Sequence, residues 1–258
     1  MDARGHAVTA LLQASGLNKR FGAVVAAADL DITVEAGERV SLIGSNGAGK
    51  TTFVNMITGY LKPDTGRILL AGRDITALAP RAITRLGVAR SFQIPQLYAD
   101  LTVLDNMLVA NACHDQRLSF WQPARRSEAV DRAMALLQRF RLAEHRERRV
   151  AELPGGVRKL LDIAMALTAR PKLLLLDEPT SGVSADEKFP MMDTLMNALV
   201  GETDTTLLFV EHDMDIVERH ASRVIAFYAG RVIADDVPAR ALATDDVRRY
   251  VTGELITE

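Results

Sequence analysis

Residues 44–51 constrain the fold of this chain most strongly, because they read Gly-Ser-Asn-Gly-Ala-Gly-Lys-Thr and fit the phosphate-binding loop pattern G-x-x-x-x-G-K-[ST]. The apolar run 40–43 precedes the loop and predicts a short buried strand. Residues 52–58 follow it and predict the start of a helix that Gly59 closes. A strand, a glycine-rich loop and a helix in this order predict an α/β nucleotide-binding core.

The residue types of the loop suit a polyphosphate ligand. Glycines allow unusual dihedral angles, so that consecutive N–H groups can point at phosphate, and the start of the helix adds partial positive charge. Lys50 supplies a mobile positive charge for the outer phosphates, and the Thr51 hydroxyl can bind Mg²⁺. The residues expected to bind a nucleoside triphosphate are Gly44, Ser45, Asn46, Gly47, Ala48, Gly49, Lys50, Thr51 and Thr52.

The composition limits the other possibilities. With 258 residues, 48% of them hydrophobic, the chain can form one large domain or two closely packed subdomains. Its net charge of −2 provides no general attraction to nucleic acid or anionic lipid, so no nucleic-acid partner is expected. The single cysteine, Cys113, cannot form an internal disulfide, which suits a reducing cytosol. No apolar segment approaches the length that spans a bilayer, so a membrane role is expected to require partner subunits.

Apolar runs and alternation predict strands in both halves of the chain. The predicted strands cover residues 11–16, 30–34, 40–43, 67–71, 88–92, 173–176, 207–210 and 224–227. From about residue 101 to 169 the period is that of helices, as in Val130, Met134, Leu137 and Phe140. The order of elements predicts an α/β core with a helical insertion and a small N-terminal β region.

A second group of candidate site residues follows the apolar run 173–176, which ends in Asp177 and Glu178. A buried strand would hold Asp177 rigidly beside the phosphate loop, where its carboxylate can bind Mg²⁺, often through water. Glu178 is then positioned to polarise an attacking water. The alternative is a core strand that merely ends in two acids, and the upstream phosphate loop favours the catalytic interpretation.

With these two groups in place, the chain resembles the ATP-binding subunits of ABC transporters over residues 11–253. The resemblance implies a P-loop NTPase core with a mainly parallel sheet, an N-terminal antiparallel β subdomain and an inserted α-helical subdomain. It implies a single ABC ATPase domain over residues 1–258, in which about 94–170 form the helical subdomain with the signature motif. It also implies ATP hydrolysis, with ATP and Mg²⁺ as cofactors.

Three further site residues are implied by the resemblance alone. Phe21 matches the aromatic residue that stacks on adenine, and Gln93 matches the glutamine that senses Mg²⁺. His212 follows the predicted strand 207–210 and matches the histidine that contacts the γ-phosphate. Considered in isolation, Phe21 would be a core residue and a lone histidine a surface or capping residue.

The chain departs from the family pattern at two places. The signature motif, usually Leu-Ser-Gly-Gly-Gln, reads Leu-Pro-Gly-Gly-Val at residues 153–157. Gly155 and Gly156 still permit close approach of the backbone to nucleotide, but Pro154 removes a hydroxyl and a backbone N–H. Ser184 stands where an aspartate is typical. In this family both elements cross the interface between two ATP-binding subunits, so weakened closure and slow hydrolysis are expected, with ATP binding retained.

Residues 74–80, 86–93 and 101–106 resemble the ATPases of branched-chain and hydrophobic amino acid importers. That resemblance implies two membrane permease subunits, a second ATP-binding subunit that is a copy or a paralogue, and indirectly a periplasmic substrate-binding protein. It implies a peripheral location at the cytoplasmic face of the inner membrane. Since no residue of such a subunit touches the cargo, urea, short amides and aromatic acids stay open as substrates.

The sequence also bears on three other functions. A nucleotide-binding switch with little catalysis, paired with an active paralogous ATPase, is motivated by Pro154 and Ser184. A soluble ABC ATPase that acts on DNA or ribosomes is disfavoured because tandem cassettes and long coiled-coil insertions are lacking, and a GTPase is disfavoured because no Asn-Lys-x-Asp element is present. The apolar residues Phe92, Ile94, Leu97 and Tyr98 either line a groove for a permease helix or pack two lobes together.

Overall fold

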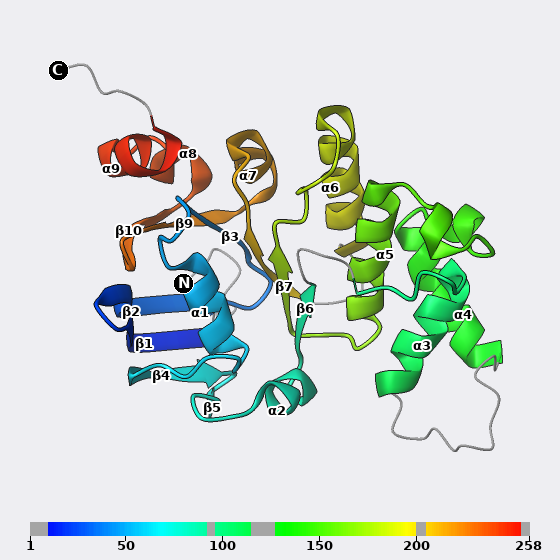
Figure 1. Ribbon diagram of the computed structural model, residues 1–258, viewed down its shortest axis with the longest axis horizontal. Helices are drawn as coiled ribbons and strands as arrows, with labels where there is room; N and C mark the ends of the chain where they lie inside the picture. Colours follow the sequence, from blue (N-terminus) through cyan, green and yellow to red (C-terminus); the bar gives the residue numbers. More distant parts are fainter. Residues whose placement is uncertain (1–9, 92–95, 115–126, 200–204, 254–258) are drawn as a thin grey trace, which may run out of the picture. The chain divides into compact units, whose positions relative to one another are not determined.

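The computed structural model describes residues 10–91, 96–114, 127–199 and 205–253 (Figure 1). The chain forms two compact units. The first combines Met1–Val88 with Asp204–Glu258, and the second consists of Ala89–Thr203. Each unit contains both strands and helices, as expected for an α/β chain.

The first unit contains an antiparallel sheet with the strand order β2-β1-β4-β5. Its strands are β1 (Ala10–Phe21), β2 (Val24–Glu35), β4 (Thr65–Leu70) and β5 (Arg73–Asp74). The first two strands form a long hairpin in which Leu12 is paired with Val34 and Ala14 with Ile32. All four of these side chains are buried, because alternating apolar residues cover one face of the sheet.

Four further strands of the first unit are neighbours in the order β10-β9-β3-β8. They are β3 (Arg39–Gly44), β8 (Thr206–Val210), β9 (Arg223–Tyr228) and β10 (Arg231–Asp236). β3 pairs in parallel with β8 and with β9, whereas β9 and β10 are antiparallel. Val40, Leu42 and Ile43 are fully buried, as is typical of a parallel strand that is covered on both faces. The predicted fold class is therefore confirmed.

The helices of the first unit are α1 (Lys50–Ile57), α2 (Pro80–Arg85), α7 (Met214–His220), α8 (Pro238–Ala241) and α9 (Asp245–Val247), which continues into the π-helical turn η3 (Arg248–Thr252). α1 begins directly after the loop that follows β3 (Figure 1). A buried apolar cluster packs α7, α8 and α9 against β3 and β9. Its members are Ile43, Val217, Val224, Ala226, Ala241 and Val247.

The second unit contains β6 (Val88–Ser91), β7 (Leu173–Asp177), α3 (Val103–His114), α4 (Ser127–Arg139), α5 (Gly155–Leu167) and α6 (Ala185–Leu199), with short 3₁₀ turns η1 (Ala143–His145) and η2 (Val150–Glu152). β6 and β7 are neighbouring strands, and α3, α4 and α5 pack against one another (Figure 1). The predicted helical period is confirmed, since Leu137 and Phe140 are fully buried and Val130 and Met134 are half-buried.

Several boundaries differ from the prediction. β1 and β2 are longer than the predicted 11–16 and 30–34, because hairpin pairing continues through polar, half-exposed residues that carry no apolar signal. α1 starts at Lys50 and not at Thr52. β10 was not predicted at all: it is an edge strand whose residues are half-buried or exposed, and it therefore lacks the continuous apolar run of its neighbours.

Candidate nucleotide-binding site

The loop between β3 and α1 is shaped by three glycines whose backbone angles lie in the positive-φ region. Gly44, Gly47 and Gly49 have φ values of 148°, 80° and 113°, which side-chain-bearing residues rarely adopt. A Cβ at Gly49 would lie 2.6 Å from the carbonyl oxygen of Ala26, and a Cβ at Gly44 would collide with the carbonyl oxygen of Phe227. Two of the three glycines are therefore required by close packing as well as by their dihedral angles.

Lys50 lies at the first position of α1, with only 6% of its surface exposed. Its Nζ donates hydrogen bonds to the carbonyl oxygens of Gly44 at 2.6 Å and Ser45 at 3.1 Å. The ammonium group is thus held at the concave side of its own loop, where a polyphosphate would lie. Thr51, the next residue, is exposed, so its hydroxyl is accessible to a metal ion.

The turn between β9 and β10 holds the phosphate-binding loop in place. The backbone N–H of Gly230 donates to the carbonyl of Ala48 at 2.9 Å, and its carbonyl accepts from the N–H of Ala28 at 2.8 Å. The ring of Tyr228 in the same turn stacks on Tyr250 of η3, with centroids 4.2 Å apart. The sequence does not reveal the role of these residues, because the turn connects β9 to β10 and β10 lacks the apolar pattern that predicts a strand.

Phe21 and His212 lie in the first unit and are both exposed. Phe21 ends β1, with 51% of its surface accessible and the Nζ of Lys19 5.7 Å from its ring centroid. His212 follows β8, and its backbone N–H donates a 3.0 Å hydrogen bond to Oε2 of the buried Glu211. Neither side chain is a core residue, in contrast to what Phe21 would be in isolation.

Asp177 ends β7 in the second unit and forms an ion pair with Arg90 of β6. The Nη2 of Arg90 lies 2.8 Å from the Oδ2 of Asp177, and the side chains are only 10% and 19% exposed. A charge-assisted hydrogen bond of this length fixes the direction in which the carboxylate points. Arg90 had no role in the sequence-based hypothesis, because its partner lies on a strand far along the chain.

Glu178 has a φ of 48°, so its backbone is in the left-handed region that non-glycine residues seldom occupy. Its carbonyl oxygen accepts a 3.0 Å hydrogen bond from the Nζ of Lys159, which is buried on α5. The same carbonyl accepts from the N–H of Ser181 at 3.0 Å. These contacts stabilise an unfavourable backbone conformation, of the kind that is concentrated at functional sites.

The signature segment starts α5, and Pro154 occupies the N-cap without any side-chain hydrogen bond to the helix. A Cβ added at Gly155 would have its nearest neighbour 3.7 Å away, and one at Gly156 3.8 Å away, which is ordinary van der Waals contact. Unlike Gly44 and Gly49, these glycines are not required by the packing of their own chain.

Ser184 has a local structural role at the start of α6. Its Oγ lies 2.9 Å from Oε2 of Glu187, and its carbonyl accepts from the N–H groups of Glu187 and Lys188. The serine hydroxyl is thus engaged by a side chain of the first turn of α6 and not by a backbone N–H of the helix. It occupies the position at which the family pattern has an aspartate.

Asp162 of α5 connects that helix to both sides of the segment that contains Gln93. The Ser91 hydroxyl donates to Oδ2 at 2.5 Å and the Gln96 N–H donates to Oδ1 at 3.0 Å. Burial raises the pKa of Asp162, while the hydrogen bonds from Ser91 and Gln96 and the charge of Lys159 lower it. Gln93 itself, with Phe92 and Ile94, lies outside the described residues.

The candidate residues thus fall into two groups. Gly44 to Thr52, Phe21 and His212 belong to the first unit, whereas Asp177, Glu178, Gly155 and Gly156 belong to the second. Within the first group Lys50 is hydrogen-bonded to the carbonyl oxygens of Gly44 and Ser45, and within the second the carbonyl of Glu178 is hydrogen-bonded to Lys159 of the signature helix. Over the parts of the chain that the structure describes, no helix is both long and apolar enough to cross a membrane.

Comparison with known proteins identifies the family of the chain. The family model described as ABC transporter matches residues 27–181. The high-affinity branched-chain amino acid transport ATP-binding protein LivG of Salmonella typhimurium is 38% identical over 253 residues, covering 95% of this chain and 98% of that protein. BraF of Pseudomonas aeruginosa, of the same description, is 36% identical over 251 residues with the same coverage. The crystal structure of the ADP conformation of MJ1267, an ATP-binding cassette of an ABC transporter, superposes with a TM-score of 0.81 at 31% identity, covering 93% of this chain and 97% of that one. The chain is therefore an ATP-binding protein of the ABC transporter family.

Proposed function

We propose that this chain is the ATP-hydrolysing motor of an importer for branched-chain or other hydrophobic amino acids. The observation that carries the proposal is the similarity to LivG and BraF, which extends over 95% of the chain. In this function the chain lies peripherally at the cytoplasmic face of the inner membrane, under two permease subunits. A periplasmic substrate-binding protein delivers the cargo to those permeases.

The phosphate-binding loop would hold the triphosphate of ATP. Gly44 and Gly49 leave no room for a side chain, so backbone N–H groups form the surface that the phosphates meet. Lys50 would move from its contacts with loop carbonyls to the outer phosphates. Thr51 and Asp177 supply oxygen atoms, which are the ligands that Mg²⁺ prefers, and the metal ion would neutralise charge on the phosphates.

The remaining side chains would act on the base, the γ-phosphate and the attacking water. Phe21 has an exposed ring, which is available to stack on adenine. Glu178 would orient and polarise the water, in a role for which its constrained backbone is suited. His212 and Gln93 would contact the γ-phosphate, and Gln93 would also sense Mg²⁺.

A second ATP-binding subunit would complete the site. A Cβ at Gly155 or Gly156 would meet no clash within the same chain, so local packing does not require glycine there, which supports an intermolecular role. In this arrangement they approach the nucleotide held by the partner subunit, and the N-terminus of α5 points at its phosphates. The partner is either a copy of this chain or a paralogue.

A weakly catalytic switch is the second candidate function, and Pro154 favours it. Its N-cap position has neither a side-chain hydrogen bond nor a backbone N–H. Each hydrogen bond to charged phosphate contributes about 1.5–3 kcal/mol, so the loss of one or two would slow closure without preventing ATP binding. Such a subunit would depend on a paralogous ATPase for turnover.

The proposal is tested first with Glu178→Gln in the full chain. We expect ATP binding to persist, ATP hydrolysis to be lost, and light scattering to show a monomer-to-dimer shift on addition of Mg-ATP. Glu144→Gln, at an exposed position of η1, is the matched control and should hydrolyse ATP like the wild type. Retained turnover in Glu178→Gln would refute its role, and a wild-type chain without turnover that stays monomeric would favour the switch.

The transported substrate needs a separate measurement. Uptake of labelled leucine should fall in cells from which this chain has been deleted and should return when the wild-type gene is restored. Restoration with Lys50→Ala should fail. Normal leucine uptake in the deleted cells, with impaired uptake of urea, a short amide or an aromatic acid, would assign the importer to another cargo.

A further inference from the structure

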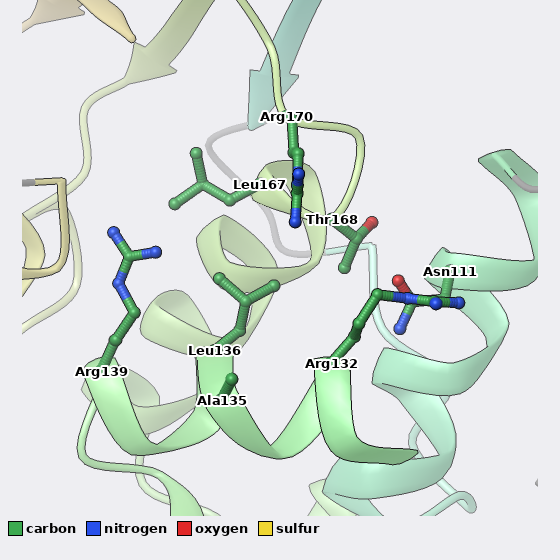
Figure 2. A pocket seen from close by; sticks show the side chains of 8 residues that line it. All are labelled: Asn111, Arg132, Ala135, Leu136, Arg139, Leu167, Thr168 and Arg170. Atoms are coloured by element: carbon green, nitrogen blue, oxygen red, sulfur yellow. The ribbon is translucent and has the colours of Figure 1, made fainter. Parts of the chain in front are cut away.

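The second unit contains a pocket with a volume of about 160 Å³ that the nucleotide site does not use. It is formed by α3, α4, the end of α5 and the loop that follows α5 (Figure 2). Asn111, Arg132, Arg139 and Arg170 supply its polar lining, and Leu136 and Leu167 are among its apolar residues. Among the described residues that line it, none is acidic.

The arginines enter the pocket from two elements. Arg132 and Arg139 lie two turns apart on the same face of α4, with Leu136 between them. Figure 2 shows Arg170 reaching in from the opposite wall, after the end of α5. Arg170 has a φ of 48°, a conformation that costs free energy and that sets the direction of its side chain.

Two of these three positive charges, those of Arg132 and Arg170, are not neutralised by an ion pair within the described parts of the chain. Arg132 and Arg170 have no ion-pair partner among the described residues, whereas Arg139 donates to the carbonyl of Ala198 and is held in place. The C-termini of α4 and α5 together contribute about one negative charge at most, so the guanidinium groups of Arg132 and Arg170 by themselves leave the pocket positive. The partial negative charges at the ends of the two helices therefore balance only part of the positive charge of the arginines.

Asn111 supplies a second, independent indication of a ligand. Its Nδ2 is buried and has no hydrogen-bond acceptor among the described residues. A buried amide donor without an acceptor is rare, because leaving it unpaired costs the full loss of its hydration. An oxygen atom of a ligand in the pocket would satisfy this donor.

We propose that this pocket binds a compact dianion of the phosphate type. Guanidinium groups match phosphate oxygens with paired, charge-assisted hydrogen bonds, and here they approach from two sides. The volume exceeds the roughly 30 Å³ of a single water and falls below the roughly 300–1,000 Å³ of pockets for drug-sized ligands. Inorganic phosphate or a small phosphate monoester suits that size.

The pocket is distinct from the nucleotide site. Gly155 begins α5 and Leu167 ends it, so the signature glycines and the pocket lie about 20 Å apart along the helix. Arg170 precedes β7, whereas Asp177 ends it, and the strand between them is about 13 Å long. Binding at the pocket therefore does not require the residues that we assign to ATP.

The test is calorimetric titration of the full chain, with its nucleotide site saturated by Mg-ADP, at constant ionic strength. The probes are inorganic phosphate, glycerol 3-phosphate and succinate, with sodium chloride as the blank. The variants are Arg132→Ser with Arg170→Ser, Asn111→Leu, and Arg149→Ser as an exposed arginine of the same unit outside the pocket. Lys50→Ala reports any phosphate bound at the phosphate-binding loop.

We expect the wild type to bind one phosphate-type ion per chain. The dissociation constant should rise about tenfold or more in the arginine double variant and should not change in Arg149→Ser or Lys50→Ala. Asn111→Leu should also weaken binding, since it removes the buried donor. Tighter binding of glycerol 3-phosphate than of phosphate would identify a monoester as the ligand, and equal binding would identify the free ion. The proposal is overturned if succinate binds as well as phosphate, if Arg149→Ser weakens binding as much as the double variant, if only Lys50→Ala abolishes it, or if no binding is detected.

Discussion

The backbone N–H of Gly230 donates a 2.9 Å hydrogen bond to the carbonyl of Ala48, in the middle of the phosphate-binding loop. The two residues come from opposite ends of the chain, and the Cα of Gly230 would also lie 3.3 Å from a Cβ placed on Gly49. The turn between β9 and β10 therefore determines how much space the loop has. Substitutions in the loop should report on this contact.

Gly49→Ala is expected to destabilise the chain by about 2–6 kcal/mol, because backbone strain adds to overpacking against Ala26 and Gly230. Nucleotide binding should be lost with the shape of the loop. Gly47→Ala is the matched control, since Gly47 also has a positive φ but no atom within 4 Å of the added Cβ; it should cost only about 1–2 kcal/mol. Urea unfolding and ADP titration measure both, and equal effects of the two variants would contradict the role of packing.

Arg90 and Asp177 should be energetically coupled. A double-mutant cycle with Arg90→Gln and Asp177→Asn is expected to give a coupling energy of about 1–3 kcal/mol in urea unfolding, because both side chains are largely buried. Arg146 and Glu147 form an exposed pair 3.6 Å apart in the same unit, and their cycle should give less than about 1 kcal/mol. Similar coupling in the two cycles would mean that the buried pair does not fix Asp177.

Asp162 should make stability depend on pH in a defined direction. Burial raises its pKa above the ordinary value of 3.8, so the folded chain holds this proton more tightly than the unfolded chain does. The contribution of Asp162 to the free energy of unfolding is therefore fully present below pH 3.8. It decreases as the pH rises from 3.8 through the raised pKa. The difference in unfolding free energy between wild type and Asp162→Asn should fall across that window and stay constant above it. A difference that rises with pH would contradict this assignment.

Pro154→Ser should strengthen nucleotide-dependent association. The new hydroxyl can cap α5, which typically stabilises a helix by about 1 kcal/mol, and it can also donate to phosphate across the interface. In the Glu178→Gln background we expect an ATP-dependent dimer that is about tenfold tighter or more, measured by analytical ultracentrifugation. Pro80→Ser, at the start of α2, is the control and should leave association unchanged.

The phosphate-binding loop could be predicted in detail because its chemistry is local. Residues 44–51 specify the dihedral angles, the charge and the helix start within one short stretch, and β3 and α1 flank it as expected. Asp177 and Glu178 were placed at the end of β7 for a similar reason, since four buried leucines precede them. Such motifs can be predicted because the residues that determine their geometry are adjacent in the sequence.

Contacts between distant segments could not be predicted in this way. Nothing near Arg90 identifies Asp177 as its partner, and nothing in an apolar strand followed by acids indicates the positive φ of Glu178. Gly230 likewise looks like an ordinary turn residue until its contact with Ala48 is seen. These features depend on tertiary packing, which a single sequence does not display.

The two hydrogen bonds of Asp162 have a mechanical consequence. One carboxylate accepts hydrogen bonds from both Ser91 and Gln96, so a displacement of either residue acts on the same position of α5. That helix begins at Gly155, so a displacement passed to Asp162 acts on the same helix that carries the signature glycines. A shift of Ser91 or of Gln96 would therefore be transmitted to α5 through a single carboxylate.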